Sequence, residues 1–220
     1  MSDLSLSTKQ DLQKFIDNKS FEKILVLAGS KSFDLSGLRE FFSSIKKKNI
    51  NFFFKKNSYP DFDELVKIIN TIKTISPDLI IAAGGGSVID YAKIANAVHL
   101  NNNLQNEIKN SSCKLNKQKR KLLAIPTTAG SGAEVTSNAV IYINGVKYSV
   151  EGELIKPDFF FLIPEFINGA SKKIKASAGF DAIAQSIESL MSKKSNEKSV
   201  SFAKKSLDLS LNYFIKFLSN

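Results

Sequence analysis

The chain has 220 residues and a formal net charge of +10, with 43% hydrophobic and 24% charged residues. These proportions are those of a globular protein with enough apolar residues for a real core, so disorder is not the default expectation. Its apolar runs are far shorter than the roughly 18 residues that a membrane helix needs. The N-terminus has no signal-peptide pattern, and the single cysteine excludes an internal disulfide or a cysteine-based zinc cluster. We therefore expect a cytoplasmic protein with no membrane partner.

The positive charge comes almost entirely from lysine, because Arg39 and Arg120 are the only arginines. Arginine is the better residue for two-point contacts with phosphates and bases. No basic–aromatic interleaving and no helix-turn-helix pattern accompanies the lysines. Nucleic-acid binding therefore rests on charge alone, and we predict no such partner. The surplus charge favours small anionic ligands, which include dinucleotides.

Apolar runs alternate with amphipathic helical patterns along the first part of the chain. In chain order, the pattern predicts a strand at Lys23–Ala28, a helix at Leu35–Lys47, a strand at Ile50–Phe54, a helix at Asp61–Ile75, a strand at Asp78–Ala83, a helix at Val88–Val98, a polar loop with a weak helical turn at Asn101–Gln118 and a strand at Leu122–Ile125. Continuous apolar strands between helices indicate an α/β fold with a parallel sheet covered on both faces. Such sheets bind their ligands at the carboxyl ends of the strands.

A β-hairpin and one more strand follow the fourth strand. Asn144-Gly145 lies between the β-prone runs Ala139–Ile143 and Val146–Val150. Asn-Gly in this setting is the strongest short-range signal for a hairpin. The apolar run Phe159–Ile163 predicts a further strand.

The C-terminal part of the chain has a helical pattern. Apolar spacing predicts helices at Ala182–Met191 and Val200–Leu218. We expect a change near Phe166, from an α/β domain over residues 1–166 to a helical domain over residues 167–220. The last helix has a broad apolar face, and exposed faces of this kind promote association, so we expect a homo-oligomer.

A first glycine-rich loop, Gly84-Gly85-Gly86-Ser87, joins the third strand directly to the third helix. Glycine lets the backbone approach a ligand closely, and a helix start offers free N–H groups and the positive end of a dipole. Ser87 is a typical N-cap residue. The loop matches neither of the standard nucleotide fingerprints. Two interpretations therefore stay open: a phosphate cradle built from backbone, or a tight turn between strand and helix.

A second loop of small residues, Pro126–Glu134, follows the fourth strand. Its three hydroxyl groups can donate to phosphate or ribose oxygens. The alternative is a polar loop that caps a helix. Two such loops at one edge of a parallel sheet suit a ligand with two phosphates and two sugars.

Three segments of the chain resemble the iron-containing alcohol dehydrogenase family. They are DLIIAAGGGSVIDYAKIANA at 78–97, AIPTTAGSGAEVT at 124–136 and AGFDAIAQSIE at 178–188. The resemblance implies a Rossmann-like dinucleotide-binding domain followed by an all-helical metal-binding domain. Because the chain ends at Asn220, we expect that second domain to be truncated.

The resemblance also implies which residues bind the cofactor. The pyrophosphate would be held by Gly85, Gly86 and Ser87. The phosphates and the nicotinamide side would contact Thr127 and Thr128, and the rest of the cofactor groove would be lined by Thr136 and Lys147.

The residues after the first strand bear on the choice between NAD and NADP. Many NAD-using members of the family have an acidic residue there, whereas this chain has Gly29-Ser30-Lys31-Ser32. A carboxylate would repel a 2′-phosphate, while hydroxyl groups, backbone N–H groups and a lysine would accept one. We therefore favour NADP over NAD, with Gly29 and Ser30 as cofactor contacts. The family commonly has Asn-Pro before the second helix, and Tyr59-Pro60 here does not supply that contact.

The family holds a divalent metal, iron or zinc, on one aspartate and three histidines, the first two ligands one helical turn apart. Asp181 matches the aspartate, and Gln185 stands where the first histidine is expected. Asp181 can alternatively be the N-cap of its helix. The single histidine, His99, ends the third helix, so we interpret it as a surface residue. Gln185 is similar to the phosphonoacetaldehyde reductase branch, which favours a small anionic aldehyde.

Two functions follow from these patterns. The first is an NAD(P)-dependent alcohol dehydrogenase or aldehyde reductase, acting on a small alcohol or aldehyde but truncated and short of metal ligands. The alternative is a non-catalytic nucleotide-binding protein that uses its helical tail for association.

Overall fold

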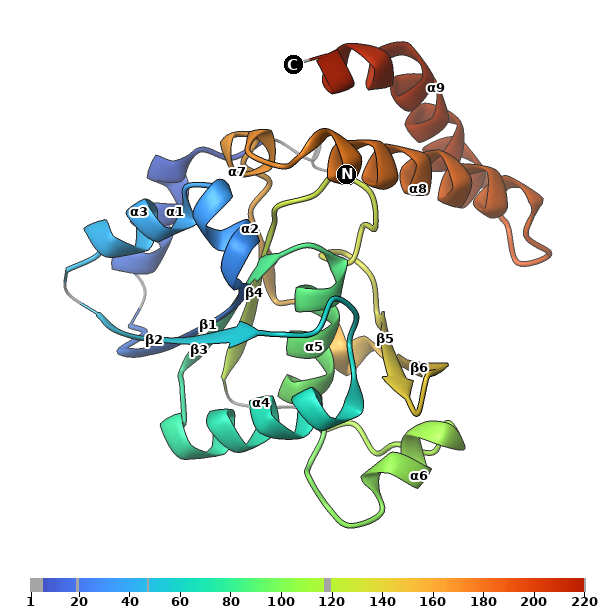
Figure 1. The fold of residues 1–220 in the computed structure, drawn as a ribbon. Helices are drawn as coiled ribbons and strands as arrows, with labels where there is room; N and C mark the ends of the chain where they lie inside the picture. Colours follow the sequence, from blue (N-terminus) through green and yellow to red (C-terminus); the bar gives the residue numbers. More distant parts are fainter. Residues whose placement is uncertain (1–5, 19, 47, 117–119, 220) are drawn as a thin grey trace. The chain divides into compact units, whose positions relative to one another are not determined.

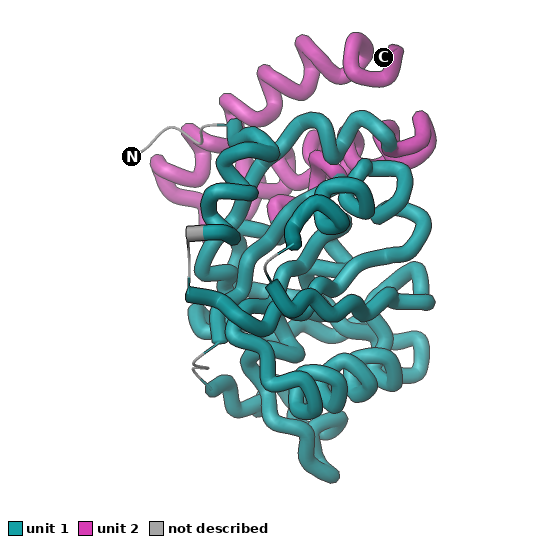
Figure 2. Tube along the Cα trace, turned by 90° about the vertical axis from the view of Figure 1, so that its left-hand side faces the viewer, with its two compact units in different colours: residues 1–127, 133–169 teal, residues 128–132, 170–220 magenta. Residues whose placement is uncertain are grey.

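The computed structural model describes residues 6–18, 20–46, 48–116 and 120–219. The chain divides into two compact units, coloured separately in Figure 2. The first unit comprises Met1–Thr127 and Ala133–Gly169, and the second comprises Thr128–Gly132 and Ala170–Asn220. Within the described ranges, no helix has both the length and the apolar character that crossing a membrane requires.

The first unit is built on a five-stranded parallel sheet with the order β2-β1-β3-β4-β7. The strands are β1 Lys23–Gly29, β2 Asn49–Lys55, β3 Leu79–Gly84, β4 Lys121–Pro126 and β7 Phe159–Phe160. The apolar runs of the three central strands are almost fully buried, as a sheet covered on both faces requires. The predicted parallel sheet is therefore confirmed, although β7 is shorter than the predicted strand Phe159–Ile163.

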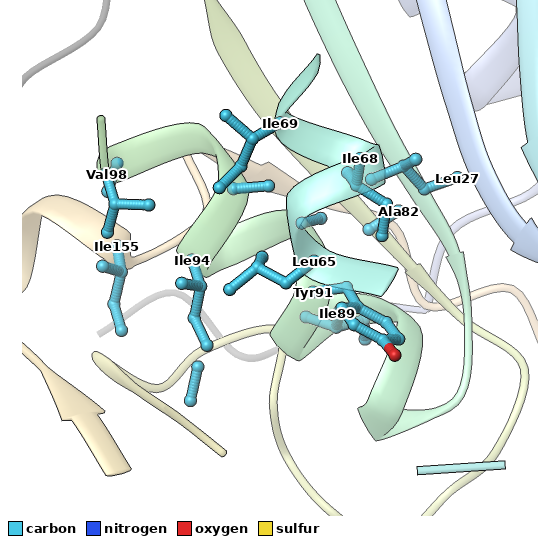
Figure 3. Packing of buried hydrophobic residues seen from close by; sticks show 14 of the residues in the cluster. Leu27, Leu65, Ile68, Ile69, Ala82, Ile89, Tyr91, Ile94, Val98 and Ile155 are labelled. Atoms are coloured by element: carbon cyan, nitrogen blue, oxygen red, sulfur yellow. The ribbon is translucent and has the colours of Figure 1, made fainter. Parts of the chain in front are cut away.

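Helices cover both faces of this sheet (Figure 1). One apolar cluster lies between the sheet and α4 Phe62–Ile75, α5 Gly86–Ala97 and α6 Leu104–Lys109; Figure 3 shows part of it. A second cluster lies between the other face and α1 Lys9–Asn18, α2 Ser30–Leu35, α3 Leu38–Ser44 and α7 Glu165–Asn168. Because α5 packs between the sheet and the hairpin, its position in the unit is fixed by contacts on several sides.

The prediction of one helix over Leu35–Lys47 is wrong. The structure has two short helices, α2 and α3, separated at Gly37. Gly37 adopts the left-handed conformation with φ of 75°, which stops a right-handed helix. Apolar spacing continues across this break, so it gives no sign of it. Lys47 itself lies outside the described residues, as do Gln118 and its neighbours at the end of the predicted polar loop.

One further helix was not expected from the sequence, and a second stands where only a weak helical turn was expected. The first, α1, begins after Thr8, where the Thr8 side chain and the Asp11 carboxylate bond each other and each other's backbone N–H groups. This reciprocal arrangement is a capping box, a signal that the sequence does contain. The second, α6, is a complete short helix within the predicted polar loop.

The predicted hairpin is confirmed. Strands β5 Asn138–Ile143 and β6 Val146–Glu151 pair antiparallel around Asn144-Gly145. Both turn residues have positive φ, 53° for Asn144 and 78° for Gly145, as the type I′ turn of a two-residue hairpin demands. A 3₁₀ turn, η1 Glu153–Ile155, follows the hairpin.

The second unit is a pair of packed helices, α8 Lys172–Met191 and α9 Glu197–Ser219, with the segment Thr128–Gly132. The Ser186 and Ser206 hydroxyls lie 2.8 Å apart across the helix pair. The Phe180 and Phe214 rings pack edge to face with centroids 5.1 Å apart. The helix α8 begins ten residues earlier than predicted, with Ser171 as its N-cap. Asp181 lies in the middle of α8, so its interpretation as an N-cap is wrong.

Candidate functional site

The two small-residue loops follow neighbouring central strands. Strands β3 and β4 are parallel and adjacent, with Gly84 paired to Pro126 at their carboxyl ends. The Thr127 N–H donates to the Gly84 carbonyl over 3.1 Å, which ties the start of the second loop to the first. Gly84 and Thr127 therefore lie together at the carboxyl edge of the sheet, where doubly wound folds bind their ligands.

The helix α5 starts directly at this edge. Gly85 is its N-cap, and the Gly85 carbonyl accepts from the N–H groups of Val88 and Ile89. No side chain caps this end, so Ser87 is a first-turn residue and its prediction as the N-cap is wrong. The first N–H groups of a helix have no carbonyl acceptor in their own helix. Gly86 and Ser87 therefore offer backbone donors at the positive end of the α5 dipole.

Gly84 serves the packing of the turn. A Cβ atom on Gly84 would lie 2.5 Å from Cγ2 of Val88, a buried β-branched side chain with little freedom to move. Only glycine lets α5 pack this closely against β3. The interpretation as a tight turn therefore holds for Gly84, while the half-buried Gly86 and Ser87 supply the backbone donors at the start of α5.

The end of β1 adds a third loop next to β3. Gly29 pairs with Lys55 at the end of β2 and is the N-cap of α2. The Ser32 hydroxyl donates back to the Gly29 carbonyl over 3.0 Å. Ser30 and Lys31 are exposed and remain available to a ligand.

The second loop does not start a helix. Residues 127–137 form bends and turns, so the alternative that this loop caps a helix is wrong. Thr127 is buried at the edge of the first unit, whereas Thr128 belongs to the second unit. In that unit, Gly130 packs so closely on α8 that a Cβ atom would lie 2.5 Å from the Ala178 carbonyl oxygen.

A buried lysine that the sequence patterns did not single out holds Thr136. Lys93 on α5 is 0% exposed, and its ammonium group donates to the Thr136 hydroxyl over 2.8 Å and to the Asn138 carbonyl over 2.9 Å. Thr136 Oγ1 accepts from this ammonium, and the Thr136 hydroxyl in turn donates to the Ala133 carbonyl over 3.4 Å. Burial lowers the pKa of Lys93 to about 8, against nearby Asp90 and Glu134, which raise it.

Asp90, one helical turn before Lys93, is hydrogen-bonded to β5, the strand that Lys93 also contacts. Its carboxylate accepts from the Val140 N–H over 3.2 Å. Burial raises the pKa of Asp90 to about 6, opposed by the Val140 N–H and by Lys93 and Lys147, which lower it. Lys147 is exposed on β6. Two ionisable groups of α5 thus fix the first strand of the hairpin against the helix that begins at the glycine loop.

The loop after β2 is fixed by Tyr91 and Glu64. The Tyr91 hydroxyl donates to Glu64 over 2.9 Å and accepts from the Asp61 N–H over 2.7 Å. The Glu64 carboxylate also accepts from the backbone N–H groups of Lys56 and Asn57. These bonds hold the segment that contains Tyr59-Pro60, where the family commonly has Asn-Pro.

The two predicted metal ligands lie one turn apart on α8, in the second unit. Both are exposed, and the Gln185 amide donates to the Asp181 carboxylate over 2.9 Å. In the described part of the chain, no three His, Cys, Asp or Glu residues gather closely enough to hold a metal ion. His99, the only histidine, is exposed after α5 in the first unit. The described residues therefore supply one anionic ligand and a neutral amide, which do not make a metal centre.

The structure brings together the predicted cofactor residues of the first unit. Gly29 and Ser30 follow β1, Gly85 to Ser87 follow β3, and Thr127 follows β4, which are three adjacent strands. Thr136 is tied to α5 through Lys93, and Lys147 lies near Asp90. Thr128, Asp181 and Gln185 lie in the second unit.

Comparison with known proteins agrees with this arrangement. A 4-hydroxybutyrate dehydrogenase from Clostridium kluyveri is 31% identical over 159 residues, 71% of this chain and 42% of that protein. A phosphonoacetaldehyde reductase from Streptomyces viridochromogenes is 28% identical over 146 residues, 63% of this chain and 37% of that protein. Sulfoacetaldehyde reductase from Bifidobacterium kashiwanohense, solved with NAD+, shares the fold with a TM-score of 0.88 at 20% identity, over 98% of this chain and 58% of that one.

The chain spans less than half the length of these two sequence relatives. Over that span, the model of the family described as iron-containing alcohol dehydrogenase matches residues 7–164, which include the loops after β1, β3 and β4 and the hairpin. The chain therefore belongs to the iron-containing alcohol dehydrogenase family.

Proposed function

We propose that the first unit binds the diphosphate of a nicotinamide adenine dinucleotide, and that the chain is an alcohol dehydrogenase- or aldehyde reductase-like oxidoreductase. The observation that carries this proposal is the adjacency of the two loops, with Thr127 bonded to Gly84 at the carboxyl edge of the sheet. The helix α5 begins at that edge, so its positive dipole end and the N–H groups of Gly86 and Ser87 both favour a diphosphate there.

The roles of the chain's own residues follow from this placement. Gly85, Gly86 and Ser87 hold the diphosphate through backbone, and Thr127 adds a hydroxyl at the neighbouring strand end. Thr136, held by Lys93 and by the Ala133 carbonyl, lines the rest of the cofactor groove together with Lys147. A bound nicotinamide ring supplies the hydride chemistry, which no side chain of the protein can provide.

We further propose that the cofactor is NADP rather than NAD. Ser30 and Lys31 are the exposed groups after β1, and no carboxylate stands among Gly29 to Ser32. The nearest acidic residue of α2, Asp34, is paired with Arg39. A 2′-phosphate at this loop therefore meets a lysine and a hydroxyl without a repelling carboxylate.

No step of this proposal depends on the metal centre of the family. Asp181 and Gln185 bond each other, and the described residues gather no further ligands around them. This observation favours a second candidate function: a nucleotide-binding protein without turnover, which associates through its helical unit. We expect purified protein to contain much less than one equivalent of iron or zinc.

Fluorescence titration with NADPH and NADH tests the cofactor proposal. We expect saturable binding, with NADPH the tighter ligand. Gly86→Asp puts a negative charge at the start of α5 and should weaken binding at least about tenfold, because it repels the diphosphate. The control is Asn102→Asp, the same charge change at an exposed position in the loop after α5. Absence of binding by the wild type, or equal binding by the Gly86→Asp variant, would contradict the proposal.

A turnover assay separates the two functions. NADPH oxidation is followed with butyraldehyde and with phosphonoacetaldehyde, each with and without added iron or zinc. The second aldehyde is included because one sequence relative reduces it, according to its name. Cofactor binding with metal-dependent oxidation supports the oxidoreductase. Binding without oxidation under any of these conditions supports the non-catalytic alternative.

A further inference from the structure

A hollow of about 680 Å³ lies at the opposite edge of the first unit, where α4 and α5 end and β4 begins. We call it the basal hollow. Its floor contains Ile69, Ile72 and Val98, and its rim contains Lys73, His99 and Arg120. The volume is within the range of small-molecule sites. The proposed cofactor edge is at the other ends of the same strands, so the basal hollow is a separate place.

The floor and the rim have different chemistry. The three floor residues are at most 7% exposed, whereas Lys73 and His99 are exposed. No acidic residue lines the hollow in the described part of the chain. Two carboxylates at the same edge are already bonded: Asp78 accepts from backbone N–H groups, and Asp158 is paired with Lys121. The described residues that line the hollow therefore supply an apolar floor and basic groups at its rim.

Arg120 is held in place along one edge of its guanidinium group. Its Nε donates to the Asn96 side-chain oxygen over 2.8 Å, and its Nη2 donates to the Asn96 carbonyl over 3.3 Å. Asn96 is only 7% exposed, so this anchor is fixed by the core. Among the described residues, no carboxylate forms a salt bridge with Arg120. The rest of the fork is preorganised for a planar anion, a geometry that favours a carboxylate.

Basic residues at helix C-termini also have an ordinary role, since they offset the negative end of the dipole. The ends of α4 and α5 are partly satisfied already, by the N–H groups of Ser76, Val98 and Asn116. Offsetting the dipoles would require neither a hollow nor an apolar floor. The combination of a floor, an anchored guanidinium and a second cation therefore goes beyond helix capping.

We propose that the basal hollow binds an amphipathic carboxylate, with its hydrocarbon chain on the floor and its carboxylate at Arg120 and Lys73. The site is independent of the nucleotide, because it lies at the amino ends of the strands. The proposal therefore gives the first unit a second small-molecule site, separate from the proposed cofactor site.

Calorimetric titration with octanoate, below its micellar concentration, tests this proposal. Octyl glucoside has the same chain without the charge, and acetate has the charge without the chain. We expect both to bind at least about tenfold more weakly than octanoate, because each lacks one of the two contacts. Equal binding of octyl glucoside and octanoate, or no saturable binding of octanoate, would overturn the proposal.

Substitutions locate the site. Arg120→Gln should weaken octanoate binding about tenfold through the lost charge-assisted bond, and Lys73→Gln about threefold because that charge is exposed. Lys67→Gln, on the same helix outside the hollow, should leave binding unchanged. Thermal unfolding checks that the Arg120→Gln variant still folds. The Lys73→Gln variant tests the site without changing the hydrogen bonds between Arg120 and Asn96. NADPH affinity should be the same in all three variants.

Two results would refute this location. The first is octanoate binding that neither substitution weakens. The second is displacement of octanoate by NADPH, which would place it at the cofactor edge. Neither result bears on whether the nucleotide binds, so the two proposals fail separately.

Discussion

The helices α5 and α8 each contain a segment that resembles the family, yet they differ sharply in burial. In α5, nine of the twelve residues are buried, whereas in the twenty residues of α8 the buried ones are Lys175 and Ser186. The start of α5 is therefore held by the core of its own unit, with Lys93, Asp90 and Tyr91 bonded to surrounding segments. Asp181 and Gln185 are exposed and have each other as partners. The proposed nucleotide-binding edge therefore lies within the first unit, whereas the described residues do not complete the predicted metal positions.

The largest expected effect comes from Lys93→Leu. This change leaves the Thr136 hydroxyl and the Asn138 carbonyl without their ammonium partner, and it should lower the free energy of unfolding by about 3 kcal/mol. Urea unfolding measures it, with the exposed Lys67→Leu on α4 as the matched control. We expect NADPH binding by the folded fraction to weaken as well, because Thr136 loses its anchor. A Lys93→Leu variant as stable as the wild type would contradict the role of Lys93 in holding α5 against the hairpin.

Gly84→Ala should have the next largest effect. Its Cβ atom would meet Val88 at 2.5 Å, and overpacking of this kind costs about 2 kcal/mol. Gly132→Ala is the matched loop control, because its added Cβ meets nothing within 4 Å and the cost, about 1 kcal/mol, comes from its φ of 61°. The same unfolding measurement compares the two. Equal losses of unfolding free energy in the two variants would show that the close packing of α5 on β3 does not determine the stability of this turn.

The pH dependence of stability gives a smaller effect. The raised pKa of Asp90, about 6 against 3.8, means that the folded protein takes up this proton at a higher pH than the unfolded chain. The contribution of Asp90 to stability therefore grows as the pH falls from about 6 towards 4 and is lost as the pH rises. Asp90→Asn cannot titrate, so at pH 7 it should be more stable than the wild type by on the order of 1 kcal/mol, and this difference should narrow as the pH falls towards 4. A gap that does not change with pH would contradict the burial of this carboxylate.

The smallest effect on folding is expected in α9. Leu211 and Ile215 are 63% and 69% exposed and lie one helical turn apart. Leu211→Lys with Ile215→Lys should change the free energy of unfolding by less than about 0.5 kcal/mol. Sedimentation should show concentration-dependent association of the wild type that this double variant reduces, because an exposed apolar face drives it. A wild type that stays monomeric at high concentration would contradict the predicted oligomer.

The sequence was sufficient wherever the signal was local. Apolar strand runs followed by glycine predicted the strands and the loops at their ends, and Asn144-Gly145 predicted the hairpin. Sequence patterns failed to predict where helices begin and end when the backbone conformation determines these points. Gly37 breaks a helix although the apolar spacing continues across it, and the N-cap of α5 is Gly85 rather than Ser87. Asp181 failed as an N-cap because α8 begins at Lys172.

The residues that support the candidate site depend on tertiary structure. Asp90 and Lys93 are charged positions inside an otherwise apolar helix, which is a signal that the sequence contains. Their partners cannot be read from it, because Thr136 is 43 residues away along the chain from Lys93, and Val140 is 50 residues from Asp90. Sequence therefore predicts that a loop can bind phosphate, and the fold shows what holds that loop.

The most direct test of the nucleotide edge is an amide NMR titration of the chain with NADPH. If the backbone donors at the start of α5 and the Thr127 hydroxyl hold the diphosphate, the N–H signals of Gly86, Ser87 and Thr127 shift first and most, with those of Ser30 and Lys31 following. Saturable binding of NADPH that leaves the signals of Gly86, Ser87 and Thr127 unmoved would contradict this account.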